Sequence, residues 1–226
     1  MCFHSKWEHS QGEATLSWDV SGYYMYLPAI LIYHDVKKCE FKDTIIERYH
    51  PTNIFDQAFI DTASGNYVMK YSIGQALVMA PFFSIAHLYC LSSKHDRADG
   101  FSYPYQFAIG VGMFLISLLG VYYLRKVLLH FFPDAIVAMV LIAIVFGTNY
   151  LNFSTIDQCM THSSLFTIYA LILYLTISFH KKPAIETAII LAIFIGWATL
   201  IRPTEILSVL IPLFWNVSTY REWKSK

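Results

Sequence analysis

Three long stretches of the sequence contain no charged side chain. They cover residues 103–124, 135–156 and 158–179, and a fourth, shorter stretch covers 187–201. A helix needs roughly 20 predominantly apolar residues to cross a bilayer, because the hydrocarbon core is about 30 Å thick and each residue adds about 1.5 Å. Repeated stretches of this length predict an all-α, polytopic membrane protein.

The positions of basic residues predict how these helices alternate across the membrane. We expect about five transmembrane helices, at 103–124, 134–156, 158–179, 184–202 and 206–220. Short loops rich in Lys and Arg stay on the cytoplasmic side. Such residues follow the first, third and fifth helices, as Arg125, Lys126, Lys181, Lys182, Arg221, Lys224 and Lys226. The turns that hold Asp157 and Arg202 are therefore expected on the outer face.

The first hundred residues are polar and rich in aromatic side chains, which divides the chain into two regions. We expect residues 1–102 to form an outer loop with interfacial helices, and residues 103–226 to form the transmembrane bundle. Residues 22–33 are apolar but too short to span, so they predict a helix lying in the membrane interface. Residues 71–91 are long enough to span but contain several polar side chains, and hydropathy alone leaves open whether this helix crosses.

Composition excludes several classes of protein. The formal net charge is zero, which provides no large basic surface for nucleic acid, and membrane lipid is the expected partner. The four cysteines show no C-x-x-C spacing and predict packing residues instead of a metal or redox site. No phosphate-binding P-loop, G-x-S-x-G or H-E-x-x-H motif occurs, so common soluble-enzyme templates do not apply.

A few ionisable residues stand at the edges of the apolar stretches, where chemistry could take place. Asp19 precedes the interfacial helix, and Asp157 lies between two predicted spans with His162 close behind it. Either carboxylate could act in catalysis or simply cap the helix that follows. Arg202 and Lys70 stand at membrane boundaries, where each could bind a phosphate or extend its charge toward lipid headgroups.

The order of these residues resembles the GT-C superfamily of membrane glycosyltransferases, which use polyprenyl-phosphate sugar donors. Members include protein O-mannosyltransferases and lipid A aminoarabinose transferases. The resemblance rests on Asp19 in WDVSGYYMYLPA, on the pair Lys70-Tyr71, and on Asp157 in STIDQCMTHSSLFTIYALILYL. The family keeps both acids on the outer side of the membrane, which implies that helix 71–91 does not span or is re-entrant.

The resemblance implies a glycosyltransferase that moves a sugar from a lipid-linked donor to an acceptor outside the cytoplasm. Asp19 would be the catalytic residue, and Arg202 with Lys70 would bind the donor phosphate. Asp157 with His162 would hold a divalent metal ion or orient the donor, since some members of the family use a metal and others do not. The implied location is a bacterial inner membrane, with the active face toward the cell envelope.

Two other functions remain open from the sequence. A transporter or channel would use the ionisable residues to line a substrate path, and a non-catalytic membrane scaffold would use the aromatic region to bind a protein partner. The resemblance also implies a further helix before Asp19 and more helices after residue 226, as in the N-terminal part of a longer transferase.

Overall fold

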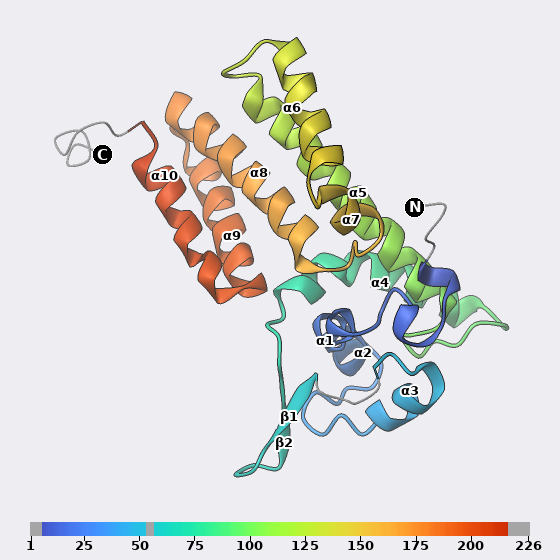
Figure 1. The fold of residues 1–226 in the computed structure, drawn as a ribbon. Coiled ribbons are helices and arrows are strands. Elements are labelled where there is room, and N and C mark those ends of the chain that lie inside the picture. The colour runs from blue at the N-terminus through green and yellow to red at the C-terminus, as the bar shows by residue number, and fades with distance from the viewer. Residues whose placement is uncertain (1–5, 53–56, 217–226) are drawn as a thin grey trace.

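The computed structural model describes residues 6–52 and 57–216, and 68% of the structure is helical. The head consists of two short 3-10 helices, three short α-helices and a β-hairpin (Figure 1). These are η1 (Lys6–Glu8), η2 (Gln11–Glu13), α1 (Asp19–Tyr24), α2 (Tyr26–Leu31), α3 (Lys42–Tyr49), β1 (Ala58–Asp61) and β2 (Asn66–Met69). The bundle consists of α4 (Gly74–Ser92), α5 (Tyr103–Leu128), α6 (Asp134–Gly147), α7 (Tyr150–Thr155), α8 (Thr161–Lys181), α9 (Ile185–Ile201), η3 (Pro203–Val209) and α10 (Leu210–Phe214).

Within the described residues, three helices are long and apolar enough to cross a membrane: α4, α5 and α8. The apolar segments 134–147, 185–201 and 203–214 also form helices but are shorter. The structure thus confirms a mostly helical chain with helices that could span a membrane, while the expected number of about five spans stays a prediction. The basic residues Arg221, Lys224 and Lys226 lie outside the described residues.

The predicted helix 134–156 is interrupted near its middle, which hydropathy did not indicate. The Thr148 hydroxyl donates to the carbonyl oxygen of Ile144 at 2.6 Å and accepts the backbone N–H of Tyr150 at 3.1 Å. A threonine side chain that bonds to the backbone in this way competes with the regular helix ladder. The chain therefore ends α6 at Gly147 and begins α7 at Tyr150.

The bundle helices alternate in direction between the head and the far end (Figure 1). Helices α5 and α8 both begin near the head and pack side by side, and the Thr167 hydroxyl of α8 donates to the carbonyl oxygen of Ile116 in α5 at 2.8 Å. At the far end, Lys126 of α5 lies 5.5 Å from the ring centre of Tyr174 in α8. The pairs Arg125-Lys126 and Lys181-Lys182 thus lie away from the head, as the predicted alternation requires.

The head contains a β-hairpin that the sequence analysis did not anticipate. Strands β1 and β2 are antiparallel, with Ala58 opposite Met69 and Asp61 opposite Asn66. The Asp61 carboxylate accepts the backbone N–H of Ser64 at 2.9 Å and its hydroxyl at 2.6 Å, which closes the turn. This short sheet is the one departure from the expected all-α fold among the described residues.

Helix α4 runs across the head-side ends of the other bundle helices instead of along them (Figure 1). Its first residue, Gly74, lies against the last turn of α9, where an added Cβ would come within 2.4 Å of the Leu200 carbonyl oxygen. Further along, its Phe83 packs against Tyr105 in the first turn of α5, with ring centres 5.3 Å apart. Because α4 touches the C-terminal end of α9 and the N-terminal end of α5, it lies crosswise to both.

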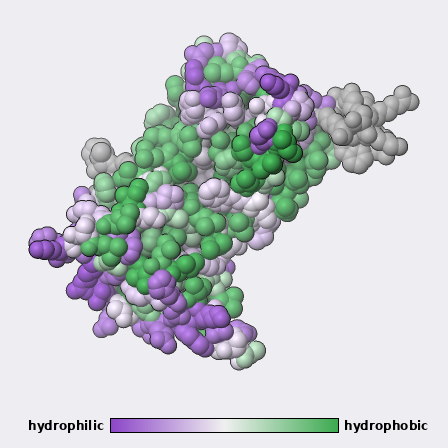
Figure 2. All heavy atoms as spheres, turned by 180° about the vertical axis from the view of Figure 1, so that it is seen from behind, coloured by the Kyte–Doolittle hydropathy of each residue, from purple (hydrophilic) through white to green (hydrophobic). Residues whose placement is uncertain are grey.

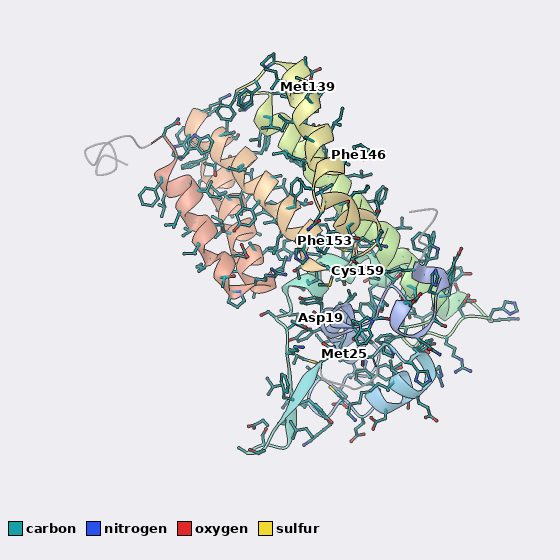
Figure 3. All side chains as sticks on the ribbon, in the orientation of Figure 1. Asp19, Met25, Met139, Phe146, Phe153 and Cys159 are labelled. Atoms are coloured by element: carbon teal, nitrogen blue, oxygen red, sulfur yellow. The ribbon has the colours of Figure 1, made fainter. Side chains whose placement is uncertain are left out.

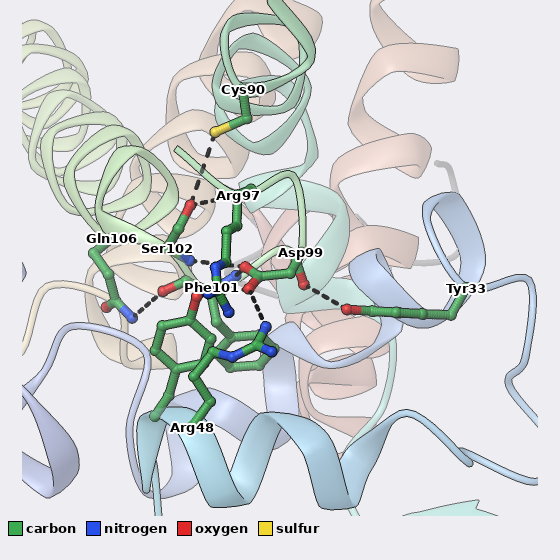
Figure 4. A network of polar contacts seen from close by, with 9 residues as sticks. Tyr33, Arg48, Cys90, Arg97, Asp99, Phe101, Ser102 and Gln106 are labelled. Carbon is green, nitrogen blue, oxygen red and sulfur yellow. Dashed lines mark hydrogen bonds and ion pairs between the residues drawn. The ribbon is translucent and has the colours of Figure 1, made fainter. Parts of the chain in front are cut away.

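The loop after α4 returns to the head and is held there by Asp99 (Figure 4). One carboxylate oxygen of Asp99 accepts the backbone N–H groups of Phe101 and Ser102, at 3.0 and 3.1 Å. The other oxygen accepts the Tyr49 hydroxyl at 2.6 Å and pairs with Arg48 at 3.3 Å. The side chain of Asp99 is only 11% exposed, so these partners compensate for most of its lost hydration.

Apolar side chains cover much of the outer surface of the bundle, and hydrophilic residues gather at the head and at the far end (Figure 2). In α6, Met139 is 63% exposed and Phe146 is 71% exposed, and both point away from the bundle in Figure 3. Soluble monomers rarely expose contiguous apolar surface of this kind. This apolar surface accompanies the three described helices that are long and apolar enough to cross a membrane.

Replacing Asp99 should loosen the head from the bundle. Asp99→Asn removes the charge that Arg48 and Tyr49 face inside a largely buried site, and the expected loss of stability is about 2–3 kcal/mol. Thermal unfolding in detergent micelles, followed by limited proteolysis, measures it. The control is Asp96→Asn in the same loop, whose carboxylate accepts the nearby Ser93 hydroxyl. Equal stability of the two variants would contradict a holding role for Asp99.

Candidate functional site

Asp19 begins α1 but does not cap it. The N-cap residue is Trp18, and no side chain caps this helix end by a hydrogen bond. Instead, the Asp19 Oδ1 atom accepts the Tyr71 hydroxyl at 2.6 Å, from the segment that enters α4. The geometry favours a positioned carboxylate over the alternative that Asp19 is only a helix cap.

The backbone just before Asp19 is strained. Trp18 has φ 53°, in a region that bulky residues seldom adopt, and its backbone N–H donates to the Pro51 carbonyl oxygen at 3.0 Å. Such a conformation costs on the order of 1–3 kcal/mol and is found most often where function requires it. Its position beside Asp19 makes this turn a candidate functional element.

Two tyrosines form the centre of the site. The rings of Tyr23 and Tyr71 lie 4.2 Å apart, which the absence of a side chain at Gly22 permits. A Cβ at Gly22 would come within 2.7 Å of the Tyr71 ring and 2.4 Å of the Gln57 side chain. Burial raises the pKa of the Tyr23 phenol, and Asp19 adds to this shift, while Arg202 and Thr161 oppose it. Tyr23 therefore stays a neutral hydroxyl between an anion and a cation.

Arg202 reaches this tyrosine pair from the end of α9. Its guanidinium donates to the Thr161 hydroxyl at the start of α8, at 2.7 Å. The backbone that carries it is fixed by Trp197, whose indole N–H donates to the Gly74 carbonyl oxygen at 3.0 Å. Arg202 thus points into the protein toward Tyr23, and simple extension toward lipid headgroups does not describe it.

Lys70 lies near the second tyrosine of the pair, Tyr71. Its ammonium is 5.2 Å from the ring centre of Tyr71, the tyrosine whose hydroxyl binds Asp19. A cation over an aromatic face is attracted by the negative charge of the ring. Asp19, Lys70 and Arg202, which the sequence analysis selected separately, are therefore gathered around Tyr23 and Tyr71.

Asp157 lies in the turn between α7 and α8, where it is held by two partners. The Lys6 ammonium donates to its Oδ1 atom at 2.5 Å, and the Asn152 amide donates to its Oδ2 atom at 3.0 Å. Burial raises the pKa of Asp157, but the hydrogen bonds from Lys6 and Asn152 outweigh it, so the net pKa is lowered. Asp157 is also not the N-cap of α8, which is Met160.

The two acids selected from the sequence line one cavity. It has a volume of about 240 Å³ and opens between the head and the turn before α8. Figure 3 shows Asp19, Phe153 and Cys159 along this junction. The cavity wall includes both carboxylates, the Lys6 amine and two aromatic side chains, Trp18 and Phe153. Trp18 is 53% exposed, so its ring is accessible to a bound molecule.

His162 is not brought to this cavity. Its ring stacks on Phe153, with ring centres 4.0 Å apart, and it lines a separate depression beside Tyr150 and Phe166. Among residues 6–52 and 57–216, no three His, Cys, Asp or Glu side chains form a group that could hold a metal ion. Because Asp157 is already bound by Lys6 and Asn152, the residues present do not fit the expected metal site of Asp157 and His162.

An apolar groove lies close to the cavity, between α4 and α5. It has a volume of about 580 Å³, and its lining includes Phe82, Tyr89 and Phe107. Phe107 also contacts Trp7, the neighbour of Lys6, with ring centres 5.6 Å apart. Phe107 of the groove therefore packs against the residue next to Lys6, which lines the polar cavity.

Sequence reasoning missed several residues that shape the site. In the sequence, Tyr71 is simply the neighbour of Lys70, and Tyr23 is one of several tyrosines in an apolar segment. Lys6 and Thr161 carried no signal, because a lone lysine and a threonine are common at helix ends. The three described cysteines, Cys39, Cys90 and Cys159, are free and buried, which confirms them as packing residues.

Comparison of the chain with protein-family models, with curated proteins and with solved structures finds no match. A function for the site must therefore be argued from its geometry and chemistry.

The spacing between Gly22 and Tyr71 should control the site. Gly22→Ala forces the Tyr71 ring away from α1, and the overpacking is expected to lower stability by about 1–3 kcal/mol. The matched control is Gly196→Ala in α9, where nothing lies within 4 Å of an added Cβ. Stability of that control should be unchanged or higher, since alanine favours helix more than glycine. Thermal unfolding of both variants in micelles tests the difference.

Proposed function

We propose that this protein is a membrane glycosyltransferase of the GT-C type, which transfers a sugar from a polyprenyl-phosphate donor to an acceptor outside the cytoplasm. The observation that carries the proposal is the shared cavity of Asp19 and Asp157, two acids far apart in the sequence. The resemblance to this superfamily points to the same two residues. A scaffold has no need to direct both into one cavity.

In the proposal Asp19, which lines the cavity, is the general base. In the proposed reaction it takes the proton of an acceptor hydroxyl while that oxygen forms a bond to the anomeric carbon of the sugar. The bond between this carbon and the phosphate oxygen breaks, and the lipid phosphate leaves with the electron pair. The Tyr71 hydroxyl, by binding Oδ1, orients the carboxylate for this proton transfer.

The cations around the tyrosine pair support a phosphate-bearing donor. Negative charge grows on the phosphate as the glycosidic bond breaks, and fixed cations that face it lower the barrier. Arg202 is held in place by its hydrogen bond to Thr161. The Lys70 ammonium lies over the ring of Tyr71, one of the two tyrosines of the pair. In the proposal both residues bind the departing lipid phosphate.

The placement of α4 supports the outer-face topology that the proposal requires. The helix has 19 residues, or about 28 Å at about 1.5 Å per residue, so its length permits a span. However, the head precedes α4, and the loop after α4 returns to the same head through Asp99 and Tyr49. A helix whose two flanking segments contact one another on one side cannot also separate them across a membrane. In the proposal α4 lies in the interface.

The apolar groove between α4 and α5 supports a lipid-linked donor. An interfacial α4 leaves this groove at the edge of the hydrocarbon layer, where a polyprenyl chain can enter from the side. Phe107 of the groove contacts Trp7, the neighbour of Lys6 in the polar cavity. In the proposal the donor's chain occupies the groove while its sugar phosphate reaches Asp19.

Transfer activity provides the direct test. The purified protein is reconstituted in liposomes with a polyprenyl-phosphate sugar donor, and sugar transfer is measured for Asp19→Asn. Loss of a general base is expected to lower the rate by about 10²–10⁴-fold without loss of folding. The control is Asp134→Asn at the far end, where Asp134 pairs with Arg125. Normal transfer by a folded Asp19→Asn protein would rule out the proposed role of Asp19.

Accessibility labelling tests the topology separately. Single cysteines are introduced at Ser64 and His95, both exposed in the structure, and at Lys181, the last residue of α8. An impermeant maleimide on intact cells should label positions 64 and 95, whose segments flank α4, and leave 181 unlabelled. Labelling of only one of the first two positions would show that α4 crosses the membrane.

A further inference from the structure

We propose that Lys6 is the fixed cation of the cavity, so that Asp157 works as an ion pair with a lysine ammonium and the site needs no divalent metal ion. The geometric part stands on the structure alone, and the part that concerns sugar transfer rests on the proposed function. It identifies Lys6 as a positioning residue, which acts through Asp157.

Each oxygen of the Asp157 carboxylate accepts a hydrogen bond from a protein group. Lys6 and Asp157 are 151 residues apart in the sequence, yet their charged atoms lie 2.5 Å from each other. Asn152 binds the second carboxylate oxygen at 3.0 Å. A metal ion at Asp157 would have to lie beside an ammonium that carries charge of the same sign, and the repulsion between the two disfavours its binding.

Lys6 is held at the cavity by its neighbours and is not a freely moving surface lysine. Trp7 packs edge to face on Phe107 of α5, at 5.6 Å and an interplanar angle of 89°. Trp7 also covers Gly110, where an added Cβ would lie 3.3 Å from its ring. The Lys6 side chain is only 31% exposed. The packing of η1 on α5 therefore directs the amine toward the turn that carries Asp157.

The remaining cavity residues do not complete a metal site. Asp19, the other carboxylate of the cavity, binds the Tyr71 hydroxyl. Magnesium and manganese ions require several oxygen ligands, of which carboxylates are the main protein contribution. A lysine ammonium has three N–H groups, so Lys6 can hold Asp157 and still donate to an oxygen of a bound sugar phosphate. It thereby supplies the fixed positive charge that a metal ion would supply.

A zero-length cross-link tests the ion pair without any assay of activity. A water-soluble carbodiimide activates the Asp157 carboxylate, and the Lys6 amine then attacks it to form an amide, with the water taken up as the urea. Mass spectrometry of the digested protein should find the two peptides joined and lighter by one water. Lys6→Arg keeps the charge but cannot form this amide and is the matched control. Absence of the joined peptides from the wild-type protein would overturn the proposal.

Metal binding and metal dependence form the second part of the test. Electron paramagnetic resonance of added Mn²⁺ is measured for the wild-type protein and for Asp157→Asn. We expect both proteins to bind the same amount of Mn²⁺, because Asp157 does not bind a metal ion. If the wild-type protein binds an Mn²⁺ ion that Asp157→Asn does not bind, the proposal is wrong, whether or not the protein transfers sugar. These two readouts therefore decide the role of Lys6 even if the proposed function fails.

Where sugar transfer is measurable, it should be unchanged by EDTA. Lys6→Met should lower the rate by about 10- to 100-fold, as for other groups that orient a reacting side chain, and Lys6→Arg should retain most of it. The control Lys38→Met removes an exposed lysine that binds the Gly65 carbonyl oxygen in the hairpin, and it should have no effect. Loss of transfer in EDTA with recovery in Mn²⁺ would overturn the metal-independent role, as would normal transfer by Lys6→Met.

Discussion

The way in which the head meets the bundle depends on the buried carboxylate of Asp99. Its hydrogen bonds to Tyr49, Phe101 and Ser102 fasten the loop after α4 to the head that precedes α4. With both flanking segments fixed on one side, α4 must lie across the ends of the bundle. A carboxylate that is 11% exposed would be costly if it were unpaired, so the loop and the head are held together by the need to satisfy this charge.

The crosswise position of α4 also assembles the candidate site. The segment that enters α4 carries Lys70 and Tyr71, and the close contact of Gly74 with the last turn of α9 brings Arg202 beside them. Tyr71 then reaches Asp19 at the start of α1. The tyrosine pair is thus in contact with one anion, Asp19, and near two cations, Lys70 and Arg202. The second acid, Asp157, also lines the cavity, where it forms an ion pair with Lys6.

The sequence predicted the helices well where the length of an apolar stretch alone decides the structure. The stretches 103–124 and 158–179 became α5 and α8, because about twenty apolar residues without a helix breaker have few alternatives in lipid. It failed at Thr148, where one hydroxyl that bonds to the backbone interrupts a uniformly apolar run. It also missed the hairpin at 58–69, whose turn depends on the Asp61 carboxylate and not on hydrophobic pattern.

The sequence by itself determined that the chain is helical and apolar enough for a membrane, and it selected Asp19, Asp157, Lys70 and Arg202 as residues at membrane edges. Only the tertiary structure decided which of them meet. The pair of Tyr23 and Tyr71 is the meeting point of Asp19, Lys70 and Arg202. By contrast, His162 stacks on Phe153, and Asp157 pairs with Lys6. The physical reason is that hydropathy is a property of local composition, while a site is made by contacts between distant segments. Those contacts depend on how close backbones can approach and on which buried charges find a partner.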